Sequence, residues 1–278
     1  MPITHIVVLA LLQGITEFLP VSSSAHLIFP SQLLGWEDQG LAFDVAVHVG
    51  TLLAVVLYYF NDLTKIATQT IASIFKRRNT TMSRIGWYII IATIPAAAAG
   101  YFLESYISTI ARSIHVIAYT TNGFGLLLGI SSYLNRQRNW HSLVNITERT
   151  DSLNRMSLQQ AILIGFAQAL ALIPGTSRSG ITLTAGLLLG LRPEAAARFS
   201  FLLSIPIIIA SALLEGIKLM HNETVGADPG EMLIGMVISF VTAIIVIHLF
   251  MRFISRSGMG IFVLYRLLLG FILLYFFA

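Results

Sequence analysis

Two short polar segments, each set among apolar residues, carry the side chains best suited to chemistry in this chain. In the first, Gln13 and Glu17 are four residues apart and so share one face of a helix. A carboxylate and an amide oxygen on one face can bind Mg²⁺ or Ca²⁺, and both cations bridge phosphates. The serines of 22–24 and His26 follow, which adds a hydroxyl nucleophile, with Ser23 as the candidate, and a group that transfers protons near neutral pH.

The second segment, PGTSRSGIT at 174–182, has the composition of an anion-binding turn. Gly175 lets a neighbouring backbone or a ligand approach closely. Free N–H groups at the start of a following helix suit phosphate oxygens, and the planar guanidinium of Arg178 can bind a phosphate through two parallel hydrogen bonds. The hydroxyls expected to assist are those of Ser177, Ser179 and Thr182.

Each feature also has a simpler explanation. Runs of Ser and Gly mark close helix packing in membranes, and Glu17 with Arg178 would also serve as a structural ion pair. A histidine in an apolar helix is more often packed and hydrogen-bonded than functional. We interpret three of them in this way: His48, His115 and His248. We interpret Arg266 as a residue outside the site. Its side chain would extend to the membrane surface or neutralise an acid such as Asp44.

The composition requires most of the chain to lie in a membrane. Of its 278 residues, 56% are apolar and 11% are charged, against about 25% charged in a typical soluble domain. Uncharged runs at 157–177 and 232–251 each match the ~20 residues with which a helix crosses the hydrocarbon. The sparse charge excludes a nucleic-acid-binding protein, which needs clustered Lys and Arg. Because the chain has no cysteine, disulfide and thiolate chemistry are excluded too.

The hydropathy pattern predicts an all-α integral membrane protein with about six spanning helices and two re-entrant helical hairpins. The expected spans are 45–60, 86–103, 113–134, 199–214, 232–251 and 259–277. Two further apolar regions do not fit single spans. Residues 1–36 are interrupted by Pro20, the serine run and Pro30, and residues 157–191 are interrupted by the turn 174–180. Each region therefore predicts two short helices joined by a polar turn.

Loop charges orient these elements. The net charge of +4 reflects basic segments at 61–85 and 135–156, which are expected in the cytoplasm, whereas the acidic segment 215–231 is expected outside. Each half of the chain then holds one hairpin and three spans, and because three is odd the halves form an inverted-topology repeat. The predicted organisation is a single membrane domain of 1–278, with repeat halves of 1–134 and 157–278 and a cytoplasmic loop of 135–156.

The two polar turns are expected to meet in a wet cavity. Backbone outside a helix survives at membrane depth only inside protein or against water, because lipid satisfies neither N–H nor C=O groups. A charged side chain near the bilayer centre costs about 3 kcal/mol on insertion scales. Glu17 and Arg178 stand in such surroundings, and an ion pair or a shared polar ligand is the least costly way to keep both.

These segments resemble the two motifs of the bacterial undecaprenyl-diphosphate phosphatases, the bacitracin-resistance family. The first, QGITEFLPVSSSAH at 13–26, is similar to the family pattern of Glu or Gln, three residues, then Glu. The second is similar to the pattern Pro-Gly-x-Ser-Arg-Ser-x-x-Thr and has all six of its fixed residues. The resemblance extends to the length, the order of apolar segments and the stretch FSFLLSIP at 199–206, so it covers nearly the whole chain.

The resemblance implies an enzyme of the bacterial cytoplasmic (inner) membrane that hydrolyses undecaprenyl diphosphate to undecaprenyl phosphate and inorganic phosphate. This reaction recycles the carrier lipid for cell-wall synthesis and confers bacitracin resistance. It also implies inverted repeats, a pocket that opens toward the outer side, and dependence on a divalent cation, Mg²⁺ or Ca²⁺. Carried over by motif, the catalytic residues are Glu17, Ser23, His26 and Arg178, the metal ligands are Glu17 and Gln13, and the substrate-binding residues are Ser22, Gly175, Ser177, Arg178, Ser179 and Thr182.

Several alternatives stay open at this point. Gln13 stands where many members of the family have a second Glu, which removes one charge from the expected metal site. The attacking group is Ser23, activated by His26 or by Glu17, or else it is a water. A lipid-phosphate transporter or flippase with the same fold is the rival function. The expected partner is the membrane lipid substrate, with a homodimer as one alternative assembly.

Overall fold

The protein is built from helices. The computed structural model describes residues 1–37, 39–77, 79–110, 113–142, 152–221 and 228–277, and every regular element in these residues is helical. The α-helices are α1 (Ile3–Thr16), α2 (Ser23–Leu34), α3 (Gly40–Tyr58), α4 (Phe60–Lys76), α5 (Thr81–Ile110), α6 (Ile114–Ser142), α7 (Leu158–Ala169), α8 (Arg178–Leu188), α9 (Pro193–His221), α10 (Pro229–Ser257) and α11 (Gly260–Phe277). Two short 3₁₀ helices cover Ser152–Arg155 and Leu170–Leu172.

Five of these helices are long and apolar enough to cross a membrane. The candidate spans are Gly40–Tyr58, Thr81–Leu103, Ile114–Arg138, Pro193–Ile217 and Pro229–Ser257. They confirm an all-α membrane protein and five of the expected spans. The expected sixth, α11, is a shorter apolar helix of 18 residues, about 27 Å long at 1.5 Å per residue. Most of these helices are longer than the predicted spans. The prediction used apolar residues alone, whereas the helices continue into polar residues at their ends.

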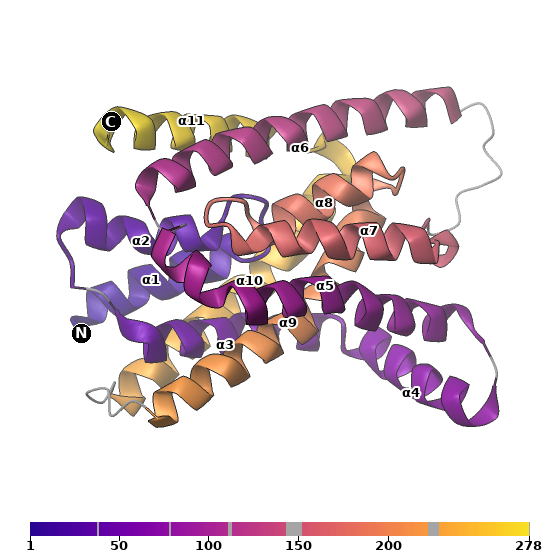
Figure 1. Ribbon diagram of the computed structural model, residues 1–278, viewed down its shortest axis with the longest axis horizontal. Coiled ribbons are helices and arrows are strands. Elements are labelled where there is room, and N and C mark those ends of the chain that lie inside the picture. The colour runs from indigo at the N-terminus through magenta and orange to yellow at the C-terminus, as the bar shows by residue number, and fades with distance from the viewer. Residues whose placement is uncertain (38, 78, 111–112, 143–151, 222–227, 278) are drawn as a thin grey trace.

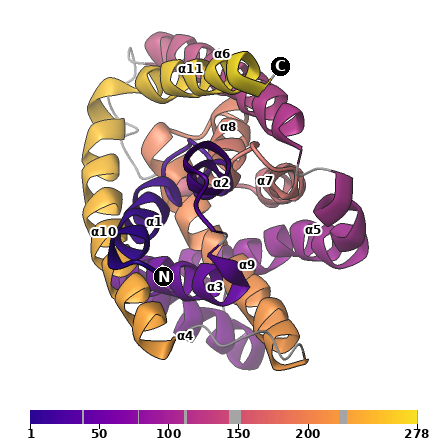
Figure 2. The same cartoon turned by 90° about the vertical axis from the view of Figure 1, so that its left-hand side faces the viewer.

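The short helices occupy the middle of the molecule and the long ones surround them. In Figure 1, α1, α2, α7 and α8 lie between the pair α6 and α11 on one side and α3, α4 and α9 on the other. The end-on view of Figure 2 shows the same hairpins enclosed by α10, α11, α6, α5, α9 and α3. The main buried cluster reaches this centre, where the ring of Phe18 meets that of Phe201 edge to face, with centroids 5.2 Å apart. The expected hairpins are therefore present, as α1–α2 and α7–α8.

Each hairpin packs against a long helix from the other half of the chain. Helix α1 packs on α10, and α7 packs on α5. Both contacts are made through a glycine. A Cβ at Gly14 of α1 would stand 2.6 Å from Cβ of Thr242, and a Cβ at Gly165 of α7 would stand 2.5 Å from the carbonyl oxygen of Ala92. Small residues let membrane helices approach closely in this way. The matching contacts agree with a repeat, while its boundaries at 134 and 157 stay a prediction.

Two features of the fold differ from the sequence-based prediction. The segment 61–85, expected as a loop, is mostly the amphipathic helix α4, which buries Ile66 and Thr70 and exposes Ile74 and Phe75. Its charged face lowers the mean hydropathy, so a search for spans passes over it. Pro30 does not interrupt the first region, because it lies inside α2.

The close contact at Gly165 gives a test of this packing. We expect Gly165→Ala to lower the melting temperature of the detergent-solubilised protein, because the new methyl group must push α7 away from the backbone of Ala92, at a cost of about 1–3 kcal/mol. The matched control is Gly216→Ala in α9, where nothing lies within 4 Å of the added Cβ. That change should leave the melting temperature unchanged or raise it, since Ala favours a helix over Gly. Equal melting temperatures for both variants would contradict the close packing.

Candidate active site

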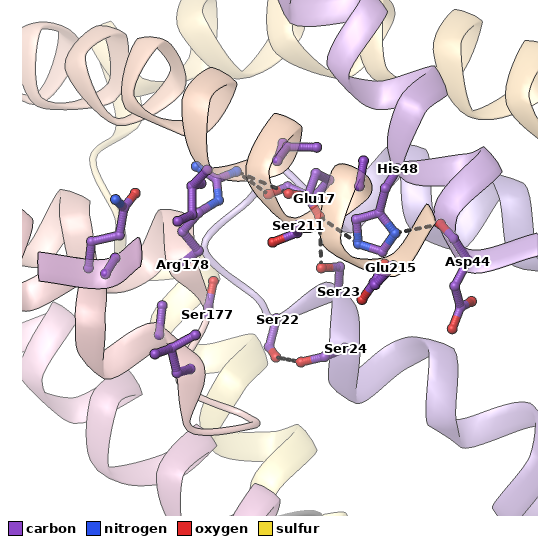
Figure 3. A pocket seen from close by; sticks show the side chains of 17 residues that line it. Glu17, Ser22, Ser23, Ser24, Asp44, His48, Ser177, Arg178, Ser211 and Glu215 are labelled. Carbon is purple, nitrogen blue, oxygen red and sulfur yellow. Dashed lines mark hydrogen bonds and ion pairs between the residues drawn. The ribbon is translucent and has the colours of Figure 1, made fainter. Parts of the chain in front are cut away.

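A cavity of about 290 Å³ opens between the two polar turns. Its walls come from the turn after α1, the turn between α7 and α8, and the helices α3 and α9. The polar residues that line it are Glu17, Ser22, Ser23, Ser24, Asp44, His48, Gln168, Ser177, Arg178, Ser211 and Glu215. Figure 3 shows Arg178 and Ser177 on one side of Glu17 and Ser23, with His48, Asp44 and Glu215 on the other. The cavity thus has a cationic side and an acidic side.

Glu17 is the centre of the polar contacts in this cavity. Its side chain is buried, and its Oε1 accepts a hydrogen bond from Nη2 of Arg178 at 3.1 Å, forming the ion pair that the sequence predicts. Oε2 accepts one from Oγ of Ser23 at 2.9 Å and one from Nε2 of Gln13 at 3.0 Å. Both carboxylate oxygens of Glu17 therefore accept hydrogen bonds, and one of the donors, Arg178, belongs to the second turn.

The two turns have matching backbone geometry. Ser22 and Ser177 each stand immediately before a helix and have positive φ values of 75° and 68°. For a residue other than glycine, such a conformation costs about 1–3 kcal/mol and persists only where surrounding contacts hold it. It directs the N-termini of α2 and α8 to the cavity wall, where their N–H dipoles favour an anion. Oγ of Ser177 also caps α8 by accepting from the backbone N–H of Gly180 at 3.2 Å.

Two further residues hold the turns together. Oγ of Ser179 donates to the carbonyl of Leu19 at 2.7 Å. Arg266 of α11 is fully buried and donates to the carbonyls of Pro20, Gly175 and Thr121 at 3.4, 2.9 and 3.2 Å. Its guanidinium thereby links both turns and α6. The interpretation of Arg266 as a residue near the surface or a partner of Asp44 was wrong.

The remaining predicted residues lie behind the cavity wall. Thr182 donates to the carbonyl of Arg178 at 2.9 Å and exchanges a hydrogen bond with Ser200 at 2.6 Å. Gly175, at φ +86°, packs against α6, where an added Cβ would stand 2.3 Å from Oγ1 of Thr120. These residues shape the second turn, whereas Glu17, Ser22, Ser23, Ser177 and Arg178 line the cavity.

His26 contacts other groups than Ser23, the residue that the sequence analysis expects it to activate. Its Nδ1 lies 2.7 Å from the carbonyl oxygen of Ser22, and its Nε2 lies 2.5 Å from the hydroxyl of Tyr265 on α11. The hydroxyl of Ser23 instead faces Glu17. Activation of Ser23 by direct contact with His26 is therefore not the arrangement found here. Glu17 holds that position.

Sequence reasoning missed five polar residues of the cavity wall: Asp44, His48, Gln168, Ser211 and Glu215. Nε2 of His48 lies 3.8 Å from Oε2 of Glu17, while its Nδ1 lies 2.7 Å from the carbonyl oxygen of Asp44. Asp44 and His48 are four apart, as Gln13 and Glu17 are. Two polar residues on one face of an apolar span are the signal that would have indicated them.

The arrangement fits a divalent cation only in part. Among the described residues, no group of three or more His, Asp or Glu side chains forms a metal site. Gln13 presents its amide nitrogen to Glu17, and its Oε1 is buried without a hydrogen-bond partner among the described residues, so its role as a ligand stays a prediction. Glu17 does fit, because it reaches the cavity and Mg²⁺ commonly binds one carboxylate together with substrate phosphates. Carboxylates of Asp44 and Glu215 in the same wall would repel a diphosphate that arrived without a cation.

The family model of the bacitracin resistance protein BacA matches residues 6–272 of the chain. The protein belongs to the BacA family. Its similar relatives are proteins named undecaprenyl-diphosphatase. That of Chromohalobacter salexigens is 52% identical and covers 97% of each chain. Those of Alteromonas mediterranea and Teredinibacter turnerae are 49% and 51% identical and cover 99% and 98% of each chain.

The position of Arg266 in this BacA family member gives a second test. We expect Arg266→Lys to lower the melting temperature of the solubilised protein, because one ammonium group cannot reach the three carbonyls that the guanidinium joins. The control is Arg252→Lys on the exposed part of α10, which should melt with the wild type. A melting temperature for Arg266→Lys equal to that of the control would show that Arg266 does not hold the turns together.

Proposed function

We propose that the protein hydrolyses undecaprenyl diphosphate to undecaprenyl phosphate and inorganic phosphate in a bacterial cytoplasmic membrane. The carrier lipid would return to cell-wall synthesis, and its recycling would confer bacitracin resistance. The observation that carries the proposal is the Glu17–Arg178 pair, which two re-entrant turns present to a polar cavity among membrane helices. The names of relatives about 50% identical over nearly the full length support the substrate.

Charge stabilisation is the main task in phosphoryl transfer, and the second turn is suited to it. Arg178 offers its guanidinium, and the N-terminus of α8 offers backbone N–H groups to the phosphoryl oxygens. An incoming diphosphate competes with Glu17 for Arg178. When Arg178 moves to the phosphate, the carboxylate of Glu17 loses its cation and becomes free to accept a proton.

The proton has a donor in place. Oγ of Ser23 already donates to Oε2 of Glu17 at 2.9 Å, so this hydroxyl is the first candidate for the nucleophile, with Glu17 as its base. Its attack on the terminal phosphorus would break the bond to the bridging oxygen and release undecaprenyl phosphate, and a water would then hydrolyse the phosphoserine to inorganic phosphate. A water in the same position would use the same base. In either case His26 acts from behind the first turn, where it joins the carbonyl of Ser22 to Tyr265 and so orients the serines.

A divalent cation is part of the proposal. Glu17 would hold Mg²⁺ or Ca²⁺ from the acidic side of the cavity, and the cation would neutralise charge on the diphosphate oxygens. Gln13 would orient the carboxylate through its 3.0 Å hydrogen bond.

The cavity is proposed to open to the outer side of the membrane, as the resemblance implies. Glu215 lines the cavity, and the segment 215–231 that begins there is acidic, whereas the segments 61–85 and 135–156 are basic. The lipid tail would leave between helices into the bilayer. A homodimer stays an alternative to the monomer.

The first prediction for this function concerns the ion pair. The purified, detergent-solubilised protein should release phosphate from a long polyprenyl diphosphate, and Glu17→Ala or Arg178→Ala should lower the turnover at least ~10²-fold, as expected for losing a charge-stabilising contact. Arg256→Ala at the exposed end of α10 is the control and should keep wild-type turnover. Near-normal phosphate release from either site variant would reject these roles. Transport of the lipid without phosphate release would favour the transporter.

The second prediction concerns the cation. Excess chelator should abolish phosphate release, and added Mg²⁺ or Ca²⁺ should restore it, because Asp44 and Glu215 line the cavity along with Glu17. Phosphate release is measured with and without chelator at constant ionic strength. Full activity in excess chelator would contradict the proposed cation.

A further inference from the structure

Gln168 is a buried polar residue of the cavity wall to which the proposed function assigns no role. Gln168 lies at the end of α7, with 1% of its surface exposed, and it lines the same cavity as Ser177 and Arg178. Its Nε2 and Oε1 are both buried, and neither has a hydrogen-bond partner among the residues that the structure describes. A buried amide without partners is costly, and most buried polar groups are paired. Gln168 therefore requires a ligand or water to satisfy it.

The first turn shows what such an amide binds. Gln13 stands nine residues before Ser22, and Gln168 stands nine residues before Ser177, the two serines with positive φ. Nε2 of Gln13 donates to a carboxylate four residues later, that of Glu17. Four residues after Gln168 the chain has Leu172, which also lines the cavity and offers no acceptor. The second turn thus repeats the donor of the first and lacks its internal anion.

Donors of the same three kinds line the cavity that Gln168 lines, although the hydroxyl comes from Ser177, the counterpart of Ser22 and not of Ser23. Glu17 accepts hydrogen bonds from Gln13, from Ser23 and from Arg178. In the second turn, Gln168 lines the cavity together with the hydroxyl of Ser177 and the same guanidinium. An anion in that cavity would have an amide, a hydroxyl and a guanidinium among the groups that line it.

We propose that Gln168 is a substrate-binding residue, whose amide nitrogen donates to a phosphate oxygen of the bound diphosphate. The inference rests on the proposed function for the identity of that diphosphate. The proposal requires the amide to turn toward the ligand, because both of its polar atoms are buried in the structure. The carbonyl oxygen of Gln168 would accept a hydrogen bond from a water that enters with the ligand.

The test replaces the amide by an apolar group of similar length. In Gln168→Met, the solubilised protein without ligand should melt at the wild-type temperature or above it, because an unpaired buried amide is gone. Its affinity for inorganic pyrophosphate, measured by titration calorimetry, should fall about 10- to 100-fold, as expected for a hydrogen bond to a charged group. The KM for a polyprenyl diphosphate should rise by a similar factor. Gln137→Met on the exposed face of α6 is the matched control and should change none of these values.

Each outcome decides the role of Gln168. A lower melting temperature without ligand would show that the amide is structural and overturn the proposal, as would unchanged pyrophosphate affinity and KM. Absence of pyrophosphate binding to the wild type would also overturn it. If the wild type binds pyrophosphate but releases no phosphate from the lipid, the proposed function fails, while the binding titration still tests Gln168. A second variant, Gln168→Glu, should weaken pyrophosphate binding further than Met does, because its carboxylate repels the anion.

Discussion

The ion pair between Glu17 and Arg178 is the constraint on which the rest of the structure depends. The two residues are 161 positions apart, and each alone would be a charge among apolar helices. Pairing them requires two re-entrant turns to reach the same depth. The other contacts then keep the turns in place: Ser179 bonds to the carbonyl of Leu19, and Arg266 bonds to carbonyls of both turns. The positive φ angles of Ser22 and Ser177 are the strain that these contacts sustain.

The same constraint explains the helix arrangement. A turn with exposed backbone groups at membrane depth must be enclosed by protein, and the end-on view of Figure 2 shows the long helices surrounding the hairpins. Glycines at positions 14 and 165 bring each hairpin close to its supporting helix. The cavity that remains is polar because helix ends with their serines line it together with polar side chains of α3 and α9.

What could be predicted from the sequence followed from the cost of polar groups in lipid. Glu17 and Arg178 needed a shared partner, and the polar turns needed enclosure, so their meeting was predictable. Gln168 was not, because a lone amide in an apolar helix has the same pattern whether it packs in the core or lines a cavity. His48 could have been found from its spacing of four residues to Asp44. The carbonyl partners of Arg266 could not be predicted either, because every residue has a backbone carbonyl and the sequence does not indicate which ones accept a hydrogen bond. Helix α4 was missed because its charged face lowers its mean hydropathy below that of a membrane-spanning helix.

The packing of each hairpin on a helix of the other half has a consequence for biosynthesis. Helix α1 packs on α10, which is synthesised much later, and Glu17 precedes Arg178 by 161 residues. At about 5–20 residues per second, the ribosome needs roughly 8–30 s to supply that arginine. During this time the nascent chain carries an uncompensated carboxylate and a hairpin without its docking surface. The insertion machinery must therefore shelter the first hairpin, and an early stop in translation would leave a fragment that cannot bury its own amino-terminal turn.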